Sequence, residues 1–125
     1  MNREHFDILF AEDDPDITLL LSTLLKRSKY SVKQAYDGLE AINAVDDIPP
    51  PKLVLLDIMM PQRDGIEVIE HIRKKPSWSN VPIVVLSAKS QQADIQLAMS
   101  RGANDFLLKP FDPHSLVQHL EKFIH

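Results

Sequence analysis

Short apolar segments alternate with longer amphipathic segments along the whole chain. Three of the apolar segments consist almost entirely of Leu, Ile and Val, which is typical of strands that are covered on both faces. The second segment is more polar, as expected for a strand at the edge of a sheet. The pattern therefore predicts strands over Phe6–Ala11, Val32–Ala35, Leu53–Leu56, Ile83–Leu86 and Phe106–Leu108.

The segments between these strands have helical spacing and helical start signals. Apolar residues recur at i, i+3, i+4 and i+7 after the first strand and again near the C-terminus, as on the buried side of a helix. Carboxylates or hydroxyls stand where helix caps are preferred, and two of them precede a proline suited to the first turn. The predicted caps are Asp14, Asp37, Asp64, Ser90 and Asp112, and Glu40 and Glu67 complete two predicted capping boxes. We expect the fourth helix to end near Gly102.

Strict alternation of strands and helices with short links predicts a parallel sheet with helices on both faces. Right-handed crossovers leave few arrangements, and five strands favour the flavodoxin-like, doubly wound α/β fold with strand order 2-1-3-4-5. A length of 125 residues suits one compact domain, so we expect residues 1–125 to form a single domain.

Composition narrows the functional classes. The net charge is −4 and there is no long basic block, so direct nucleic-acid contact by this domain is not expected. The absence of cysteine excludes disulfides and thiolate chemistry and suits the cytoplasm. The sequence has no apolar run near the roughly 18 residues of a membrane helix, and its start shows no secretory pattern. Neither of the two glycine-rich nucleotide-binding motifs, G-x-G-x-x-G and G-x-x-x-x-G-K-[ST], occurs in the sequence.

Polar residues with related chemistry follow four of the predicted strands. Glu12 and Asp13 follow the first strand, Asp57 the third, Ser87 the fourth and Lys109 the fifth. Ligands of open α/β sheets bind at the carboxyl ends of the strands, and the predicted order makes these strands neighbours. We therefore expect the five side chains to converge on one small surface, with the adjacent Asp14 acting as a helix cap.

Several carboxylates in one pocket repel one another unless a cation lies between them. With oxygen ligands and no cysteine, the cation should be hard, and Mg²⁺ is the natural candidate. One carboxylate can then attack a phosphorus atom. A lysine ammonium such as that of Lys109 and a hydroxyl such as that of Ser87 can bind the phosphate oxygens.

The chain resembles the receiver domain of two-component response regulators over essentially its whole length. The matching segments are Ile8–Asp16, Leu55–Pro61, Asp64–Gly65, Val84–Ala88, Gly102–Ala103 and Asp105–Phe111. The resemblance implies that Asp57 accepts a phosphoryl group. It also implies that Mg²⁺ is held by Glu12, Asp13, Asp57 and the backbone carbonyl of Met59.

The resemblance further implies that Lys109, the Ser87 hydroxyl and the Ala88 backbone N–H bind the phosphoryl oxygens. Ser87 and Phe106 would be the switch residues, and Lys109-Pro110 a cis peptide. Serine stands at 87 where threonine is more frequent in the family, and phenylalanine at 106 where tyrosine is frequent. Phe106 has a plainer interpretation as a core residue, which remains open.

In this family the phosphodonor is a histidine kinase or a phosphotransfer protein, and the output passes to a downstream protein or a fused domain. The resemblance implies a switch that catalyses only its own phosphorylation and dephosphorylation, without membrane contact, and a dimer that depends on phosphorylation is compatible with it. The side chains two beyond Asp57 and Ser87, Met59 and Lys89, offer no general base, which predicts a long-lived phosphoryl state.

Three other functions fit part of the pattern. A receiver can serve as an interaction module without phosphorylation, but the intact acidic set, Ser87 and Lys109 argue against this. A Mg²⁺-dependent phosphatase with an aspartyl nucleophile would need a general acid at position 59, where the chain has methionine. An FMN protein of similar fold would need a phosphate-binding loop, which the sequence lacks.

Overall fold

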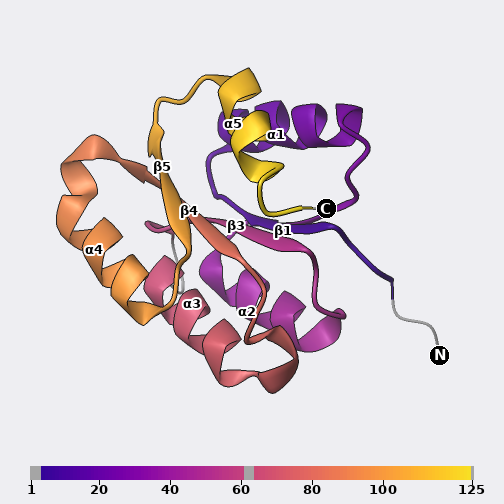
Figure 1. The fold of residues 1–125 in the computed structure, drawn as a ribbon, viewed down its shortest axis with the longest axis vertical. Coiled ribbons are helices and arrows are strands. Elements are labelled where there is room, and N and C mark those ends of the chain that lie inside the picture. The colour runs from indigo at the N-terminus through magenta and orange to yellow at the C-terminus, as the bar shows by residue number, and fades with distance from the viewer. Residues whose placement is uncertain (1–3, 61–63, 125) are drawn as a thin grey trace.

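The computed structural model describes residues 4–60 and 64–124, with the backbone alone described at Lys89. A five-stranded parallel sheet has the order β2-β1-β3-β4-β5, which confirms the predicted flavodoxin-like arrangement (Figure 1). The strands are β1 (Ile8–Ala11), β2 (Val32–Ala35), β3 (Leu53–Asp57), β4 (Ile83–Ala88) and β5 (Asp105–Lys109). The helices are α1 (Pro15–Arg27), α2 (Gly38–Asp47), α3 (Gly65–Lys74), α4 (Gln92–Arg101) and α5 (Pro113–Leu120), with 3-10 helices η1 (Pro76–Trp78) and η2 (Lys89–Gln91). Among the described residues, none of these helices has the length and apolar character to cross a membrane.

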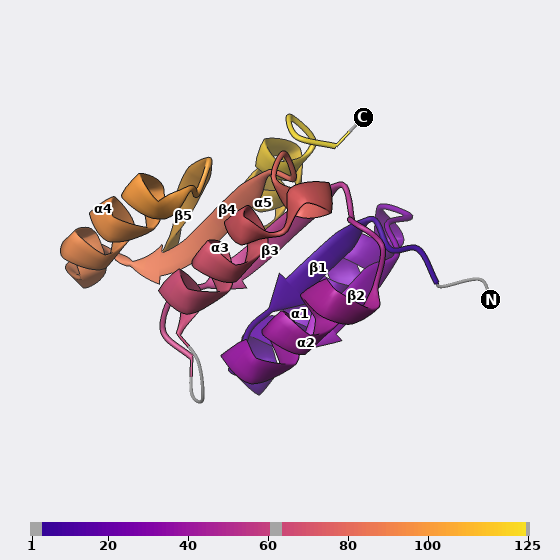
Figure 2. The same cartoon turned by 90° about the horizontal axis from the view of Figure 1, so that it is seen from below.

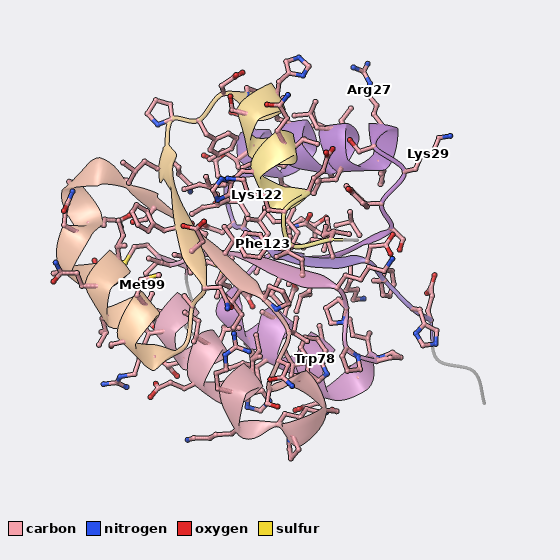
Figure 3. The ribbon with its side chains drawn as sticks, viewed as in Figure 1. Arg27, Lys29, Trp78, Met99, Lys122 and Phe123 are labelled. Atoms are coloured by element: carbon pink, nitrogen blue, oxygen red, sulfur yellow. The ribbon has the colours of Figure 1, made fainter. Side chains whose placement is uncertain are left out.

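Helices cover both faces of the sheet. In Figures 1 and 2, α1 and α5 lie on one face, and α2, α3 and α4 on the other. Strand residues alternate between two hydrophobic clusters: Leu53 and Leu55 pack toward α1 and α5, whereas Val54 and Leu56 pack toward the other helices. Trp78 is fully buried and lies in the layer of α2 and α3 (Figure 3). Burial on both faces explains why the central strands are almost continuously apolar.

Strand boundaries differ from the predicted ones at functionally important positions. The first strand begins at Ile8 rather than Phe6, since the backbone N–H groups of both Asp7 and Ile8 donate to the Ser31 carbonyl. The third, fourth and fifth strands extend past their apolar runs because backbone pairing continues there. Ala88 pairs with Lys109, for example. Asp57, Ser87 and Lys109 therefore lie within the strand ends, whereas Glu12 and Asp13 follow β1 in a loop.

Most predicted helix caps are present. Asp14 Oδ1 accepts from the Asp16 N–H at 2.9 Å, and Asp37 and Asp64 cap α2 and α3 in the same way. At α2 the return bond differs from a capping box, because the Glu40 carboxylate accepts from the Tyr36 N–H at 2.7 Å instead of from the cap residue. The carboxylates thus start three helices as the sequence predicts.

One predicted cap was wrong: Ser90 lies inside η2, and α4 begins only after this 3-10 turn. Asp112 is the N-cap residue of α5, as predicted, and its carboxylate accepts from the Ser115 hydroxyl at 2.9 Å. The predicted end of α4 is confirmed: Gly102 has φ 126°, and a Cβ there would lie 2.8 Å from Arg73 Cγ.

Candidate functional site

The carboxyl ends of β1, β3, β4 and β5 form one edge of the sheet. Asp57 at the end of β3 pairs with Leu86 of β4, and Ser87 pairs with Leu108 of β5. Gly65, at the start of α3, allows this helix to pack directly behind β3, because a Cβ there would lie 2.8 Å from the Asp57 carbonyl oxygen. The sheet order therefore brings together the strand-end residues that the sequence singled out.

Glu12, Asp13 and Asp57 form an acidic cluster. Each offers a carboxylate oxygen, and these oxygens lie within 4.8 Å of one another. Glu12 and Asp57 are buried, whereas Asp13 is exposed. The cluster is thus a pocket whose floor is shielded from water and whose Asp13 side is open to solvent.

Lys109 reaches this pocket from β5. Its Nζ donates to Glu12 Oε2 at 2.9 Å and lies 3.4 Å from Asp57 Oδ2. Glu12 Oε1 also accepts from the Asp14 N–H at 3.2 Å. One ammonium group therefore lies between two buried carboxylates, which leaves the pocket short of positive charge if both are ionised.

The pKa values of these groups reflect their burial and the charges of their neighbours. Burial, with the charge of Asp57 as the next cause, raises the pKa of Glu12 to about 7, although Lys109 acts in the opposite direction. Burial also raises the pKa of Asp57 against the opposing effect of Lys109. Burial lowers the pKa of Lys109, but its contacts with Glu12 and Asp57 outweigh this, so the pKa rises overall. A second cation would favour the ionised form of both carboxyl groups.

The donor set of the acidic cluster fits a hard divalent cation. All three side chains offer carboxylate oxygens, the ligands that Mg²⁺ prefers, and the exposed position of Asp13 leaves room for water ligands. Burial and the charge of Asp57 raise the pKa of Glu12, and a bound cation would oppose both effects. The predicted residues therefore fit a magnesium site.

Ser87 and Ala88 are held by a residue that the sequence analysis missed. The Ser87 hydroxyl is buried and donates to Gln91 Oε1 at 2.7 Å. The Ala88 N–H donates to the same oxygen at 2.8 Å. Among the described residues, no hydrogen bond joins Ser87 to Glu12, Asp57 or Lys109. The one sequence signal for Gln91 was its place three residues after Ala88, where a capping glutamine is common.

Phe106 lies on the outer part of β5 and is not a core residue. Its side chain is 39% exposed and borders a shallow groove of about 360 Å³ with Gln92, Ile95, Gln96 and Met99 of α4. Figure 3 labels Met99 on this helix. The interpretation of Phe106 as a plain core residue is therefore wrong, and its role as a switch residue stays a prediction.

The other predicted residues that the structure describes follow β3 or lie at the end of β5. The Met59 side chain is 53% exposed just after β3. Lys109-Pro110 is a cis peptide, as the resemblance implies. A second groove of about 340 Å³, lined mainly by Ile17, Leu20, Pro110 and Phe111, borders Lys109 and is largely apolar. The Lys89 side chain and Pro61 lie outside the described residues.

Comparison with known proteins agrees with this geometry. A family model described as the response regulator receiver domain matches residues 8–121. The transcriptional regulatory protein CpxR homolog of Haemophilus influenzae is 40% identical over 94% of this chain and 49% of its own length. The chain spans about half the length of the curated relatives it matches.

Solved structures show the same fold. The receiver domain of sensor histidine kinase PA1611 from Pseudomonas aeruginosa, which holds a magnesium ion in its active site cleft, is 28% identical with a TM-score of 0.86, covering 96% of this chain and 98% of that one. Chemotaxis response regulator CheY4 of Vibrio cholerae is 26% identical with a TM-score of 0.88, covering 97% of this chain and 100% of that one.

Proposed function

Because the chain belongs to the response regulator receiver domain family, we propose that it is a signalling switch that accepts a phosphoryl group on Asp57. The observation that carries the proposal is the position of Lys109 Nζ, 2.9 Å from Glu12 and 3.4 Å from Asp57 at the strand ends. Burying a carboxylate costs free energy, so the burial of Asp57 points to a functional role. Its place beside a lysine and two further carboxylates is suited to phosphoryl chemistry.

In the proposed reaction, a carboxylate oxygen of Asp57 attacks the phosphorus of a phosphohistidine. The new O–P bond forms as the P–N bond breaks, and the electron pair leaves with the imidazole nitrogen, which takes up a proton. Lys109 is already within reach of Asp57 and pairs with the phosphoryl oxygens as they arrive. The chain thus modifies itself and turns over no external substrate.

Glu12, Asp13, Asp57 and the Met59 carbonyl are the proposed ligands of Mg²⁺. The chemistry that the ion supplies when bound is neutralisation of the carboxylates and of the transferred phosphoryl oxygens. The protein's part is to hold Glu12 and Asp57 buried and Asp13 at the open side, so that the carboxylate oxygens stay within 4.8 Å of one another.

The proposed switch begins at Ser87 and Ala88. After phosphorylation, the Ser87 hydroxyl and the Ala88 N–H bind the phosphoryl oxygens, and Phe106 follows Ser87 from its exposed position toward the interior. This movement would change the groove between β5 and α4 that Phe106 now borders. The changed surface would bind a partner differently and so report that Asp57 is phosphorylated.

The proposed partners are a histidine kinase or phosphotransfer protein as donor and a downstream protein or fused domain as target. The apolar groove beside Lys109, which includes Leu20 and Phe111, gives a protein donor a surface next to the pocket. We further expect residues 1–125 to form a single receiver domain that acts in the cytoplasm and makes no nucleic-acid contact. Dimerisation on phosphorylation is a further expectation.

Incubation with acetyl phosphate and Mg²⁺, followed by intact-mass measurement, tests the proposal. We expect one phosphate on the wild type, none without Mg²⁺ and none on Asp57→Asn. Asp46→Asn, an exposed carboxylate on α2, is the matched control and should be phosphorylated normally. Phosphate on a serine or histidine would contradict the proposal, and a protein that binds its partner equally well without any phosphorylation would support an interaction module instead.

A second variant tests the role of Lys109. Lys109→Ala removes the point charge beside Asp57 but leaves the three acidic side chains in place, so we expect it to bind Mg²⁺ and to lose most of the conformational response. The response can be followed by amide chemical shifts in α4 and β5 with and without acetyl phosphate. Full retention of the response would remove Lys109 from the proposed mechanism.

A further inference from the structure

The side chain of Gln91 holds two hydrogen-bond donors at once. Its Oε1 accepts from Ser87 Oγ at 2.7 Å and from the Ala88 N–H at 2.8 Å. A backbone N–H can only donate, so the oxygen end of the Gln91 amide must face Ala88. The orientation of this side chain therefore follows from its partner.

Capping of η2 does not account for both bonds. A full capping box would need a side-chain oxygen at Ala88, which alanine lacks. The buried Ser87 hydroxyl has a nearby alternative acceptor, the Ala88 carbonyl, but only at 3.3 Å. Gln91 thus accepts hydrogen bonds from the Ser87 hydroxyl and from the Ala88 N–H. These are the same two donors that the proposed function assigns to the phosphoryl group.

We propose that Gln91 is a latch that keeps Ser87 and Ala88 from binding the phosphoryl group until Asp57 is modified. This inference rests on the proposed function. A hydroxyl hydrogen and an amide hydrogen that point at Gln91 Oε1 cannot also point at a phosphoryl oxygen on Asp57, so the two acceptors compete for the same donors. Gln91 is a positioning residue, since it touches Ser87 and Ala88 and not the reacting atoms.

The place of Gln91 in the chain connects this competition to the protein surface. Gln91 ends η2 and is the N-cap residue of α4, where its side chain makes no cap bond to the helix. The next residue, Gln92, and Ile95 border the groove that also contains Phe106. Release of Gln91 therefore frees the start of α4 beside the aromatic proposed to switch.

The first test measures binding of beryllofluoride, a phosphoryl analogue that adds to aspartate, in the presence of Mg²⁺. Gln91→Leu keeps the size of the side chain and removes the acceptor, so the free state loses two hydrogen bonds that the bound state does not need. We expect about five- to tenfold tighter binding than in the wild type. Gln118→Leu makes the same change at an exposed position of α5 and should bind as the wild type does.

Two further measurements separate a latch from general loosening of the fold. In the Ser87→Ala background, one of the two donors is missing, so the gain from Gln91→Leu should shrink. In the metal-free protein, the Ala88 amide should exchange its hydrogen faster in Gln91→Leu than in the wild type. Gln91→Glu retains an acceptor oxygen and should show neither the tighter binding nor the faster exchange.

The outcomes distinguish this inference from the proposed function. A wild-type protein that does not bind beryllofluoride at Asp57 would overturn the proposed function and the latch with it. Wild-type binding that Gln91→Leu does not strengthen would overturn the latch alone. An equal gain in Gln118→Leu, or an undiminished gain in the Ser87→Ala background, would overturn it as well.

Discussion

The two ends of the β-sheet both hold partly buried charge, and they satisfy it differently. At the amino ends of β4 and β5, the Arg73 guanidinium donates to the carbonyls of Val81, Ser79 and Gly102 at 2.8, 3.0 and 2.8 Å. It also donates to Asn104 Oδ1 at 2.9 Å. One planar cation with several donors thus ties α3 to the segments before both strands.

At the carboxyl ends, Lys109 is the ammonium shared by Glu12 and Asp57, and the pKa values of both carboxyls are raised by burial. At the amino end, acceptors from the chain itself bind the Arg73 guanidinium. The carboxyl end has more acceptor charge than the described residues neutralise. The comparison shows charge that the chain's own groups satisfy at the amino end, and carboxylate charge that a cation could offset at the carboxyl end.

The largest expected effect is at the amino end. Arg73→Ala should lower the free energy of unfolding by about 3 kcal/mol, because several carbonyls and the Asn104 side chain lose their donor. Arg73→Lys should recover little of this, since one ammonium cannot reach the same acceptors. Urea denaturation measures both.

Arg101→Ala is the control for this effect. Arg101 pairs with Glu70 on the surface, and exposed ion pairs contribute about 1 kcal/mol at most. If the Arg73 and Arg101 variants lose equal stability, Arg73 does not organise the amino end.

At the carboxyl end, stability without metal should depend on pH. Folding raises the pKa of Glu12 from 4.5 to about 7, so between these values the folded protein holds a proton that the unfolded chain has lost. Stability should therefore fall as pH rises through this window, by on the order of 2 kcal/mol. Thermal melts from pH 5 to 8 in chelator test this, and Glu12→Gln should flatten the profile. A wild-type midpoint that climbs across the window would contradict the raised pKa.

Removing one carboxylate charge should stabilise the metal-free carboxyl end. We expect the free energy of unfolding of Asp57→Asn in chelator to exceed that of the wild type by about 1 kcal/mol, because burial penalises the ionised aspartate. Mg²⁺ should raise the wild-type melting midpoint more than that of the variant. Identical melting curves for the two proteins, with and without Mg²⁺, would argue against a converged carboxylate cluster.

The smallest expected effect concerns the lifetime of the phosphoryl group. The exposed Met59 side chain cannot orient a water and, like a lysine at 89, offers no general base at neutral pH. The Met59→Asn, Lys89→Glu double variant should release phosphate about three- to tenfold faster, a change in barrier of about 1 kcal/mol. Phosphate release from the purified phosphoprotein measures this. An unchanged rate would show that these side chains do not set the lifetime.

The sheet order and the acidic cluster with its lysine could be predicted from the sequence alone. Period and apolar composition identified five strands, and Glu12, Asp13, Asp57, Ser87 and Lys109 each followed one of them. Since the carboxyl ends of neighbouring parallel strands meet, convergence followed from topology without coordinates. The caps at Asp14, Asp37 and Asp64 were equally local, because a capping side chain bonds to N–H groups only two or three residues away.

The hydrogen bonds among these residues could not be predicted from the sequence, because they depend on how separate elements pack. Lys109 bonds to Glu12 across 97 positions, and its distances to Glu12 and Asp57 depend on where β5 lies beside β4. The hydrogen bond from Ser87 to Gln91 depends on the 3-10 turn η2 between β4 and α4, where the sequence predicted a cap at Ser90. Phe106 is exposed although it lies on a strand. Periodicity reports which face of an element is buried, but burial, pKa and competition between acceptors are set by distances between separate elements, which sequence spacing does not encode.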